Sequence, residues 1–183
     1  MNGRLFSVVG PSGAGKDTLI AGIAKALPQL HVVRRVITRP AEAGGEPFEA
    51  VDASEFERRL NIGAFVIDWQ AHGLRYGIPA GLVDVLAGGQ DAVVNLSRSK
   101  LAEAASRFAR MHVLNVTARP EVLAARLGAR GRETPEDIRR RLARAALPLP
   151  AGLPVTEIDN SGALSDALRA ALATIAPEGA AVP

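Results

Sequence analysis

Short apolar runs alternate along the chain with segments whose apolar residues recur at helical spacing. The runs have the length of buried strands. They predict strands over residues 4–9, 31–36, 65–69, 92–96, 112–116 and 155–158. The intervening segments predict helices over residues 18–27, 53–60, 80–86, 99–108, 121–127 and 135–146, and a last one from 164 to 175.

This alternation predicts an α/β fold, with a mostly parallel sheet and helices on both faces. In such sheets ligands bind at the carboxyl ends of the strands. Neither an internal repeat nor a linker divides residues 1–183, so we expect one domain. Segments 39–50 and 72–79 are rich in turn residues and are expected as an exposed loop and a connector, and 177–183 as a flexible tail. Ser54 is the expected cap of the helix that begins at 53.

The segment GPSGAGKD lies between the first predicted strand and the first predicted helix. It fits the phosphate-binding pattern G-x-x-x-x-G-K in the structural context that this pattern requires. Its glycines let successive backbone N–H groups point at phosphate oxygens, and the helix that follows adds its positive end. The predicted nucleotide-binding residues are Gly10, Pro11, Ser12, Gly13, Ala14, Gly15, Lys16, Asp17 and Thr18. Lys16 is the predicted catalytic cation, because its ammonium can follow charge during phosphoryl transfer.

Asp17 stands where this pattern usually has Ser or Thr, whose hydroxyl binds Mg²⁺. A carboxylate beside a polyphosphate is repulsive unless a cation lies between them. We therefore predict that Asp17 faces Mg²⁺ and that Thr18 faces a phosphate. Asn95 ends a predicted strand where many P-loop enzymes carry an acid, which gives Asp17 a compensating role. The alternative is that Asp17 only stabilises the start of the helix.

The amino-acid composition favours some kinds of binding and catalytic chemistry and disfavours others. The chain carries 22 Lys and Arg residues against 19 Asp and Glu, and only Lys16, Lys25 and Lys100 are lysines. Arginine binds planar oxyanions in a bidentate way. Aromatic residues make up 4%, which disfavours a base-stacking platform for nucleic acid. The absence of cysteine excludes thiolate chemistry and fits a cytoplasmic protein, and neither a membrane span nor a secretion signal is predicted.

Four motifs occur in a fixed order: GPSGAGK, VITRP at 36–40, HGLRYGIP at 72–79 and RGRETPEDIRRRL at 130–142. In this order they resemble the guanylate kinase superfamily over nearly the whole chain. The resemblance implies a P-loop kinase core, an acceptor-binding region at about 35–80 and an arginine-rich lid at about 126–144.

The acceptor region keeps some superfamily positions and changes others. By resemblance, Arg39 matches the first arginine that binds the acceptor phosphate, and Tyr76 matches a tyrosine of the Y-G turn. Glu42 replaces a second arginine, and Ser97 aligns with an aspartate. Ile67 and Ile78 replace the polar residues that read guanine. Because guanine would leave its polar edge unpaired there, this region disfavours GMP as the acceptor.

The sequence GPSGAGKDTL, the segment RVITRP with a short GGE loop, and HGLRYGIP together resemble the ribose 1,5-bisphosphate phosphokinases, a family associated with bacterial phosphonate degradation. The resemblance implies transfer of the γ-phosphoryl group of ATP to the 1-phosphate of ribose 1,5-bisphosphate, with Mg²⁺, to give 5-phosphoribosyl 1-diphosphate (PRPP). Such an acceptor is already ionised at neutral pH and needs no general base. Positioning and positive charge suffice.

Arginines supply that charge in the predicted site. By resemblance Arg126, Arg130 and Arg141 take lid positions, and we expect Arg130 and Arg141 to be catalytic together with Lys16. The predicted substrate-binding residues are Arg39, Arg75, Tyr76, Ser97 and Arg132. Arg139, Arg140 and Arg144 are expected on a solvated helical face.

Two alternatives remain beside this function. One is guanylate kinase or another small-molecule P-loop kinase. The other is a non-catalytic guanylate-kinase-like binding module, which is disfavoured because such modules tend to lose the P-loop lysine and the lid arginines. The expected partner is a small-molecule sugar phosphate, with no nucleic acid and no membrane, and a homodimer is left open.

Overall fold

The computed structural model describes residues 3–40, 47–128 and 148–176. Five parallel strands form the main sheet, in the order β2-β7-β1-β8-β9. They are β1 (Leu5–Val9), β2 (His31–Val32), β7 (Ala92–Asn95), β8 (Met111–Thr117) and β9 (Val155–Asp159). The predicted α/β class and parallel sheet are confirmed.

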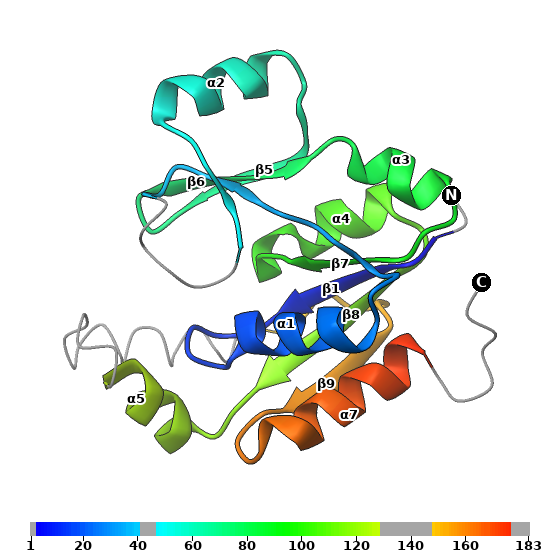
Figure 1. Ribbon diagram of the computed structural model, residues 1–183. Coiled ribbons are helices and arrows are strands. Elements are labelled where there is room, and N and C mark those ends of the chain that lie inside the picture. The colour runs from blue at the N-terminus through cyan, green and yellow to red at the C-terminus, as the bar shows by residue number, and fades with distance from the viewer. Residues whose placement is uncertain (1–2, 41–46, 129–147, 177–183) are drawn as a thin grey trace.

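The central strand β1 has no exposed residue, because helices cover both faces of the sheet (Figure 1). On one face Phe6 and Val8 pack with α1 (Lys16–Ala26) and α7 (Leu164–Ile175). On the other face Leu5 and Val9 pack with α3 (Leu82–Ala87) and α4 (Leu101–Arg107). This period-two alternation explains why both sets of positions in β1 are mostly apolar, with Ser7 as the buried polar exception.

The carboxyl ends of three neighbouring strands meet at one edge of this sheet. Val8 pairs with Asn95 of β7, and Val9 pairs with Asn115 of β8. The loop after β1 and the 3₁₀ helix η2 (Arg98–Lys100) after β7 therefore start side by side, and α5 (Pro120–Gly128) follows β8. This edge is where the fold predicts a ligand.

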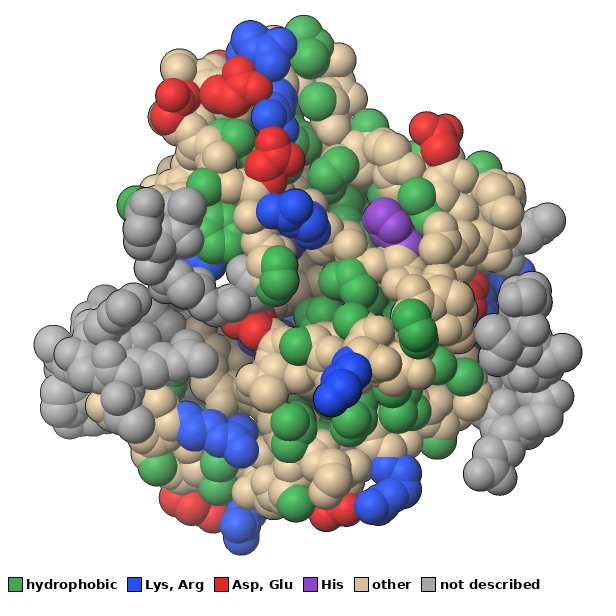
Figure 2. All heavy atoms as spheres, in the orientation of Figure 1, with side chains coloured by type: hydrophobic (Ala, Val, Ile, Leu, Met, Phe, Trp, Pro, Cys, Tyr) green, Lys and Arg blue, Asp and Glu red, His purple; other side chains and the backbone are tan. Residues whose placement is uncertain are grey.

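A second sheet has the order β4-β3-β6-β5 and consists of β3 (Val36–Ile37), β4 (Glu49–Ala50), β5 (Phe65–Ala71) and β6 (Leu74–Pro79). β6 runs antiparallel to both β3 and β5. The helix α2 (Ala53–Asn61) packs on this sheet through Phe56, whose ring stacks on that of Phe65 with centroids 4.7 Å apart. Basic and acidic side chains lie next to one another on the surface of α2 (Figure 2). Glu55 forms ion pairs there with Arg58 and Arg59.

This second sheet corrects three expectations from the sequence. Segment 31–36 is two short strands in different sheets, because the chain leaves the main sheet after Val33. Segment 72–79 contains the strand β6 as well as the tight turn at His72 and Gly73, both of which have positive φ angles. Asp52 caps α2 by accepting the Glu55 N–H at 2.7 Å, and Ser54 instead donates to Asp52. The predicted helix 135–146 and the tail 177–183 lie outside the described residues.

Within the part of the chain that the structure describes, no helix has both the length and the apolar character to span a bilayer.

The packing between α1 and the main sheet gives a stability prediction. Ile23 has no exposed surface, so Ile23→Ala removes buried carbons and leaves a cavity, and should lower the free energy of unfolding by about 2–5 kcal/mol. The same change at Ile62, which is 65% exposed, should alter it by less than about 0.5 kcal/mol. Urea denaturation of both variants measures the difference, and equal destabilisation would contradict this packing.

Candidate active site

The loop between β1 and α1 is held in a curled conformation. Gly10, Gly13 and Gly15 have φ angles of 150°, 85° and 87°, which residues with a Cβ rarely adopt. A Cβ at Gly10 would collide with the carbonyl oxygen of Val116, and one at Gly15 with the side-chain amide of Asn160. Glycine is therefore required at both positions by conformation and by space.

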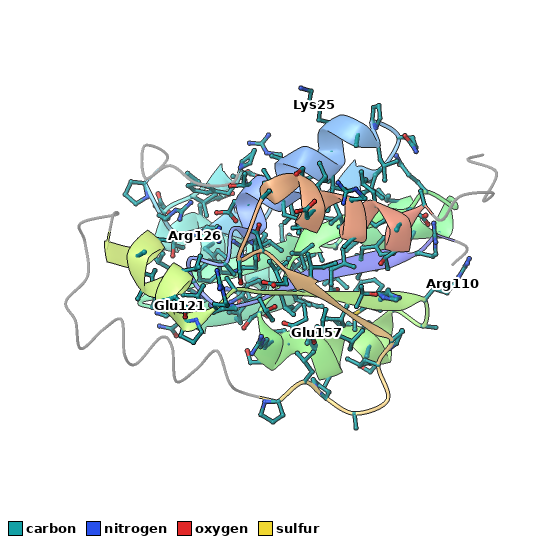
Figure 3. The ribbon with its side chains drawn as sticks, turned by 90° about the horizontal axis from the view of Figure 1, so that it is seen from below. Lys25, Arg110, Glu121, Arg126 and Glu157 are labelled. Carbon is teal, nitrogen blue, oxygen red and sulfur yellow. The ribbon has the colours of Figure 1, made fainter. Side chains whose placement is uncertain are left out.

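Two side chains from distant elements bind the backbone of this phosphate loop. Asn160, which follows β9, donates from Nδ2 to the carbonyl oxygen of Ala14 at 2.7 Å, and only 3% of its surface is exposed. Arg126 reaches the loop from α5 (Figure 3), with its Nη1 3.5 Å from the carbonyl oxygen of Gly13. The side chain of Ala14 itself is buried in the core beneath the loop.

The ammonium group of Lys16 lies against the loop. Its Nζ donates to the carbonyl oxygens of Gly10 and Pro11 at 2.8 and 2.9 Å. These acceptors belong to the phosphate loop, so the ammonium stays at the place where a polyphosphate would lie. The catalytic role of this lysine stays a prediction.

The carboxylate of Asp17 lies beside the end of β7. Asn95 Nδ2 donates to Asp17 Oδ1 at 3.0 Å, and both residues line the same pocket as the phosphate loop. Among the described residues no group of three or more His, Cys, Asp or Glu side chains surrounds a metal position. Mg²⁺ commonly takes one or two carboxylates, with phosphate oxygens and waters completing its shell. A single pocket carboxylate beside a polyphosphate loop therefore fits that ion.

A pocket of about 480 Å³ connects this loop to the second sheet. Its walls come from the phosphate loop, from the β5–β6 hairpin and from the segment after β7. Of the predicted site residues, those that line it are Gly10, Pro11, Ser12, Gly13, Gly15, Lys16, Asp17, Tyr76 and Ser97. Thr18 is exposed and does not line this pocket.

Two predicted acceptor arginines are not part of this pocket lining. Arg75 forms an ion pair with Glu57, and its guanidinium lies over the Phe56 ring at 4.8 Å from the centroid. Arg39 lies over the Phe48 ring at 4.2 Å. Arg130, Arg132 and Arg141 fall outside the described residues.

Arg35 and Arg98 line the pocket, although the sequence analysis did not select them. One signal was present for Arg35. Arg34 and Arg35 are consecutive in an extended apolar segment, where neighbouring side chains point to opposite sides, so one of the two must turn inward. For Arg98 the sequence offered no comparable signal.

Arg98 is held by a chain of hydrogen bonds below the strand ends. Its Nη2 donates to Asn115 Oδ1 at 2.8 Å, and Asn115 Nδ2 in turn donates to both carboxylate oxygens of Glu157 at 2.8 Å. Glu157 projects from β9 (Figure 3). Burial lowers the pKa of Arg98, and the charge of Glu157 opposes that shift.

The glycine-rich loop and its lysine lie at the carboxyl edge of a parallel sheet and face the hairpin sheet on the acceptor side. This arrangement defines a P-loop kinase of the guanylate kinase-like fold. The guanylate kinase from Anaplasma phagocytophilum superposes with a TM-score of 0.65 over 92% of this chain and 82% of its own, at 17% identity. A sugar kinase from Janibacter sp. gives 0.58, with coverage of 96% of both chains and 17% identity. Sequence identities this low show that the fold is shared and nothing further.

Sequence relatives define the family more narrowly. A ribose 1,5-bisphosphate phosphokinase from Ruegeria sp. is 52% identical over 97% of this chain and 94% of its own length. One from Agrobacterium fabrum is 50% identical over 89% and 91%. The chain therefore belongs to the ribose 1,5-bisphosphate phosphokinase family. No family model matches it.

A similar sequence also occurs as part of larger proteins. A bifunctional ribose 1,5-bisphosphokinase-thymidine phosphorylase from Cupriavidus pinatubonensis is 46% identical over 92% of this chain, which spans 29% of that relative.

The contact of Asn160 with the phosphate loop gives a prediction about nucleotide binding. Asn160→Ala leaves the Ala14 carbonyl without its buried donor, which costs about 1–3 kcal/mol and loosens the loop. We expect the Kd for ATP to rise roughly 5- to 150-fold. Isothermal titration with a non-hydrolysable ATP analogue measures it. Asn61→Ala, the same change at the exposed end of α2, is the control, and an unchanged Kd in Asn160→Ala would show that Asn160 does not shape the loop.

Proposed function

We propose that the protein transfers the γ-phosphoryl group of ATP to the 1-phosphate of ribose 1,5-bisphosphate, forming PRPP and ADP. The observation that carries this proposal is the pocket shared by the phosphate loop and two acceptor-side arginines, Arg35 and Arg98, in a chain about half identical to named phosphokinases of this substrate. Such a pocket suits an acceptor that is itself a multiply charged anion.

In this reaction an oxygen of the 1-phosphate attacks the γ-phosphorus. A new P–O bond forms, the bond to the bridging oxygen of ADP breaks, and that oxygen leaves in line with the attack. The nucleophile is ionised at neutral pH, so no side chain has to remove a proton. The backbone amides of the phosphate loop and Lys16 stabilise the charge that develops on the transferred group.

The acceptor must be brought against the donor despite the repulsion between two polyanions. Tyr76 and Ser97 remain proposed substrate-binding residues, because both line the pocket that contains the phosphate loop. Arg130 and Arg141 remain predicted catalytic residues, and Arg39, Arg75 and Arg132 predicted substrate residues, on the family resemblance. A transition-state arginine in such enzymes is worth roughly 10³–10⁵ in rate.

Asp17 is the proposed Mg²⁺ ligand, directly or through water, and Asn95 orients its carboxylate through the 3.0 Å hydrogen bond. A bound Mg²⁺ would neutralise charge on the donor phosphates. We place the reaction in the cytoplasm, where ATP and sugar phosphates occur, and we leave a homodimer open.

The proposed reaction has a direct test. ³¹P NMR of the protein with Mg·ATP and ribose 1,5-bisphosphate should show a pair of coupled diphosphate signals from C1 as the 1-phosphate signal disappears. Lys16→Met is the control for catalysis and should produce neither signal. Phosphorylation of GMP by the wild-type protein, with ribose 1,5-bisphosphate unchanged, would instead establish the guanylate kinase alternative.

The metal role of Asp17 is tested by a Mg²⁺ titration of activity at saturating ATP. Asp17→Asn should raise the Mg²⁺ concentration for half-maximal rate on the order of 10- to 100-fold, because the carboxylate charge is lost. Asp84→Asn, the same change in the first turn of α3, is the control. An unchanged titration with a lowered melting temperature would show that Asp17 serves only to stabilise the start of α1.

A further inference from the structure

Arg35 is the guanidinium that the second sheet contributes to the pocket. It lies just before β3 and lines the pocket together with Trp69 and Tyr76. Its Cζ lies 5.2 Å from the centroid of the Tyr76 ring and 5.9 Å from that of Trp69. Both distances are within the range of cation–π attraction.

The two rings form a rigid support. Trp69 and Tyr76 are directly opposite in the β5–β6 ladder, and their rings stack with centroids 5.1 Å apart and planes 4° from parallel. Below them Ile67 and Ile78 pair in the same ladder and are buried in the core. A guanidinium held against rings that are themselves fixed by packing loses little freedom when it binds an anion.

Arg35 remains a cation in this setting. Burial lowers its pKa to about 10, and the negative charge of Asp17 across the pocket works against that shift. At neutral pH the group is therefore charged and partly desolvated. A charge in this state gains more from a phosphate than a solvated surface arginine would.

The position of Arg35 distinguishes the two phosphates of the acceptor. The phosphate that reacts has to lie next to the γ-phosphate, on the side of Lys16 and the phosphate loop. The other phosphate, a sugar ring away, then lies toward the opposite wall, which the hairpin sheet forms. Arg75, the neighbour of Tyr76, points to the other face of that sheet and pairs with Glu57.

We propose that Arg35, supported by the Trp69–Tyr76 pair, binds the 5-phosphate of the acceptor and so restricts the enzyme to sugar bisphosphates. This inference rests on the proposed function, since it assigns the non-reacting phosphate of that substrate. Arg35 is a substrate-binding residue in this assignment, with no part in the phosphoryl transfer itself.

The test removes the guanidinium and the 5-phosphate separately and together. Arg35→Met is compared with wild type on ribose 1,5-bisphosphate and on ribose 1-phosphate, which has the reacting phosphate only, by measuring ADP release. Arg34→Met is the matched control, because Arg34 is the exposed neighbour whose Nη2 donates to the Phe48 carbonyl oxygen outside the pocket. Arg35→Lys and thermal melting of each variant show whether the fold survives.

We expect Arg35→Met to lower kcat/KM for ribose 1,5-bisphosphate on the order of 100-fold, through KM. The value for ribose 1-phosphate should change less than about threefold, since that acceptor has no group for Arg35 to bind. The KM for ATP should stay unchanged, Arg35→Lys should recover part of the loss, and Arg34→Met should match wild type.

Binding of ribose 5-phosphate, which lacks the reacting phosphate, gives an independent readout. In the presence of a non-hydrolysable ATP analogue, calorimetry should show wild-type binding that Arg35→Met weakens by a similar factor. Equal losses on both acceptors, unweakened binding of ribose 5-phosphate, or no wild-type binding of it would overturn the assignment. If wild type does not phosphorylate ribose 1,5-bisphosphate at all, the proposed function fails instead.

Discussion

The curl of the phosphate loop is the constraint on which the rest of the structure depends. Backbone N–H groups converge on a polyphosphate only when several residues adopt positive φ angles, and here glycine provides them at Gly10, Gly13 and Gly15. The loop is also enclosed: the Val116 carbonyl closes it on one side, and Asn160 binds it from the end of β9. Three strands and their register are therefore needed to shape one short loop.

The acceptor side solves a different problem, which is to keep cations charged and fixed in a partly buried place. Arg98 does so through hydrogen bonds to Asn115, and beyond it to Glu157. Arg35 does so through two stacked rings and the charge of Asp17. In both cases neighbouring groups offset the cost of removing a guanidinium from water before any ligand arrives. A site prepared in this way needs little reorganisation to take up the anionic acceptor that we propose.

The phosphate loop could be predicted from the sequence because its residues are contiguous and its spacing alone defines the geometry. The acceptor wall could not, because it depends on which face of a strand each residue occupies. The sequence predicts a connector over residues 72–79 and counts both Arg75 and Tyr76 among the substrate-binding residues. The strand β6 instead separates them, with Tyr76 in the pocket and Arg75 over Phe56. Neighbouring residues of a strand point to opposite faces of the sheet, so Arg75 and Tyr76 cannot both face the pocket.

The same alternation bears on the proposed choice of acceptor. Ile67, Trp69, Tyr76 and Ile78 all occupy the face directed toward the core, and the two isoleucines are buried where the superfamily resemblance places polar guanine readers. Isoleucine side chains cannot pair with the polar edge of a base, so guanine would bind there at the cost of unpaired polar atoms. The same isoleucines pack in the core beside the rings that support Arg35. The face of the hairpin sheet that carries the two isoleucines also carries the rings that contact the Arg35 guanidinium, so an apolar face and a positioned cation occur together, and the cation suits the phosphate of the proposed acceptor.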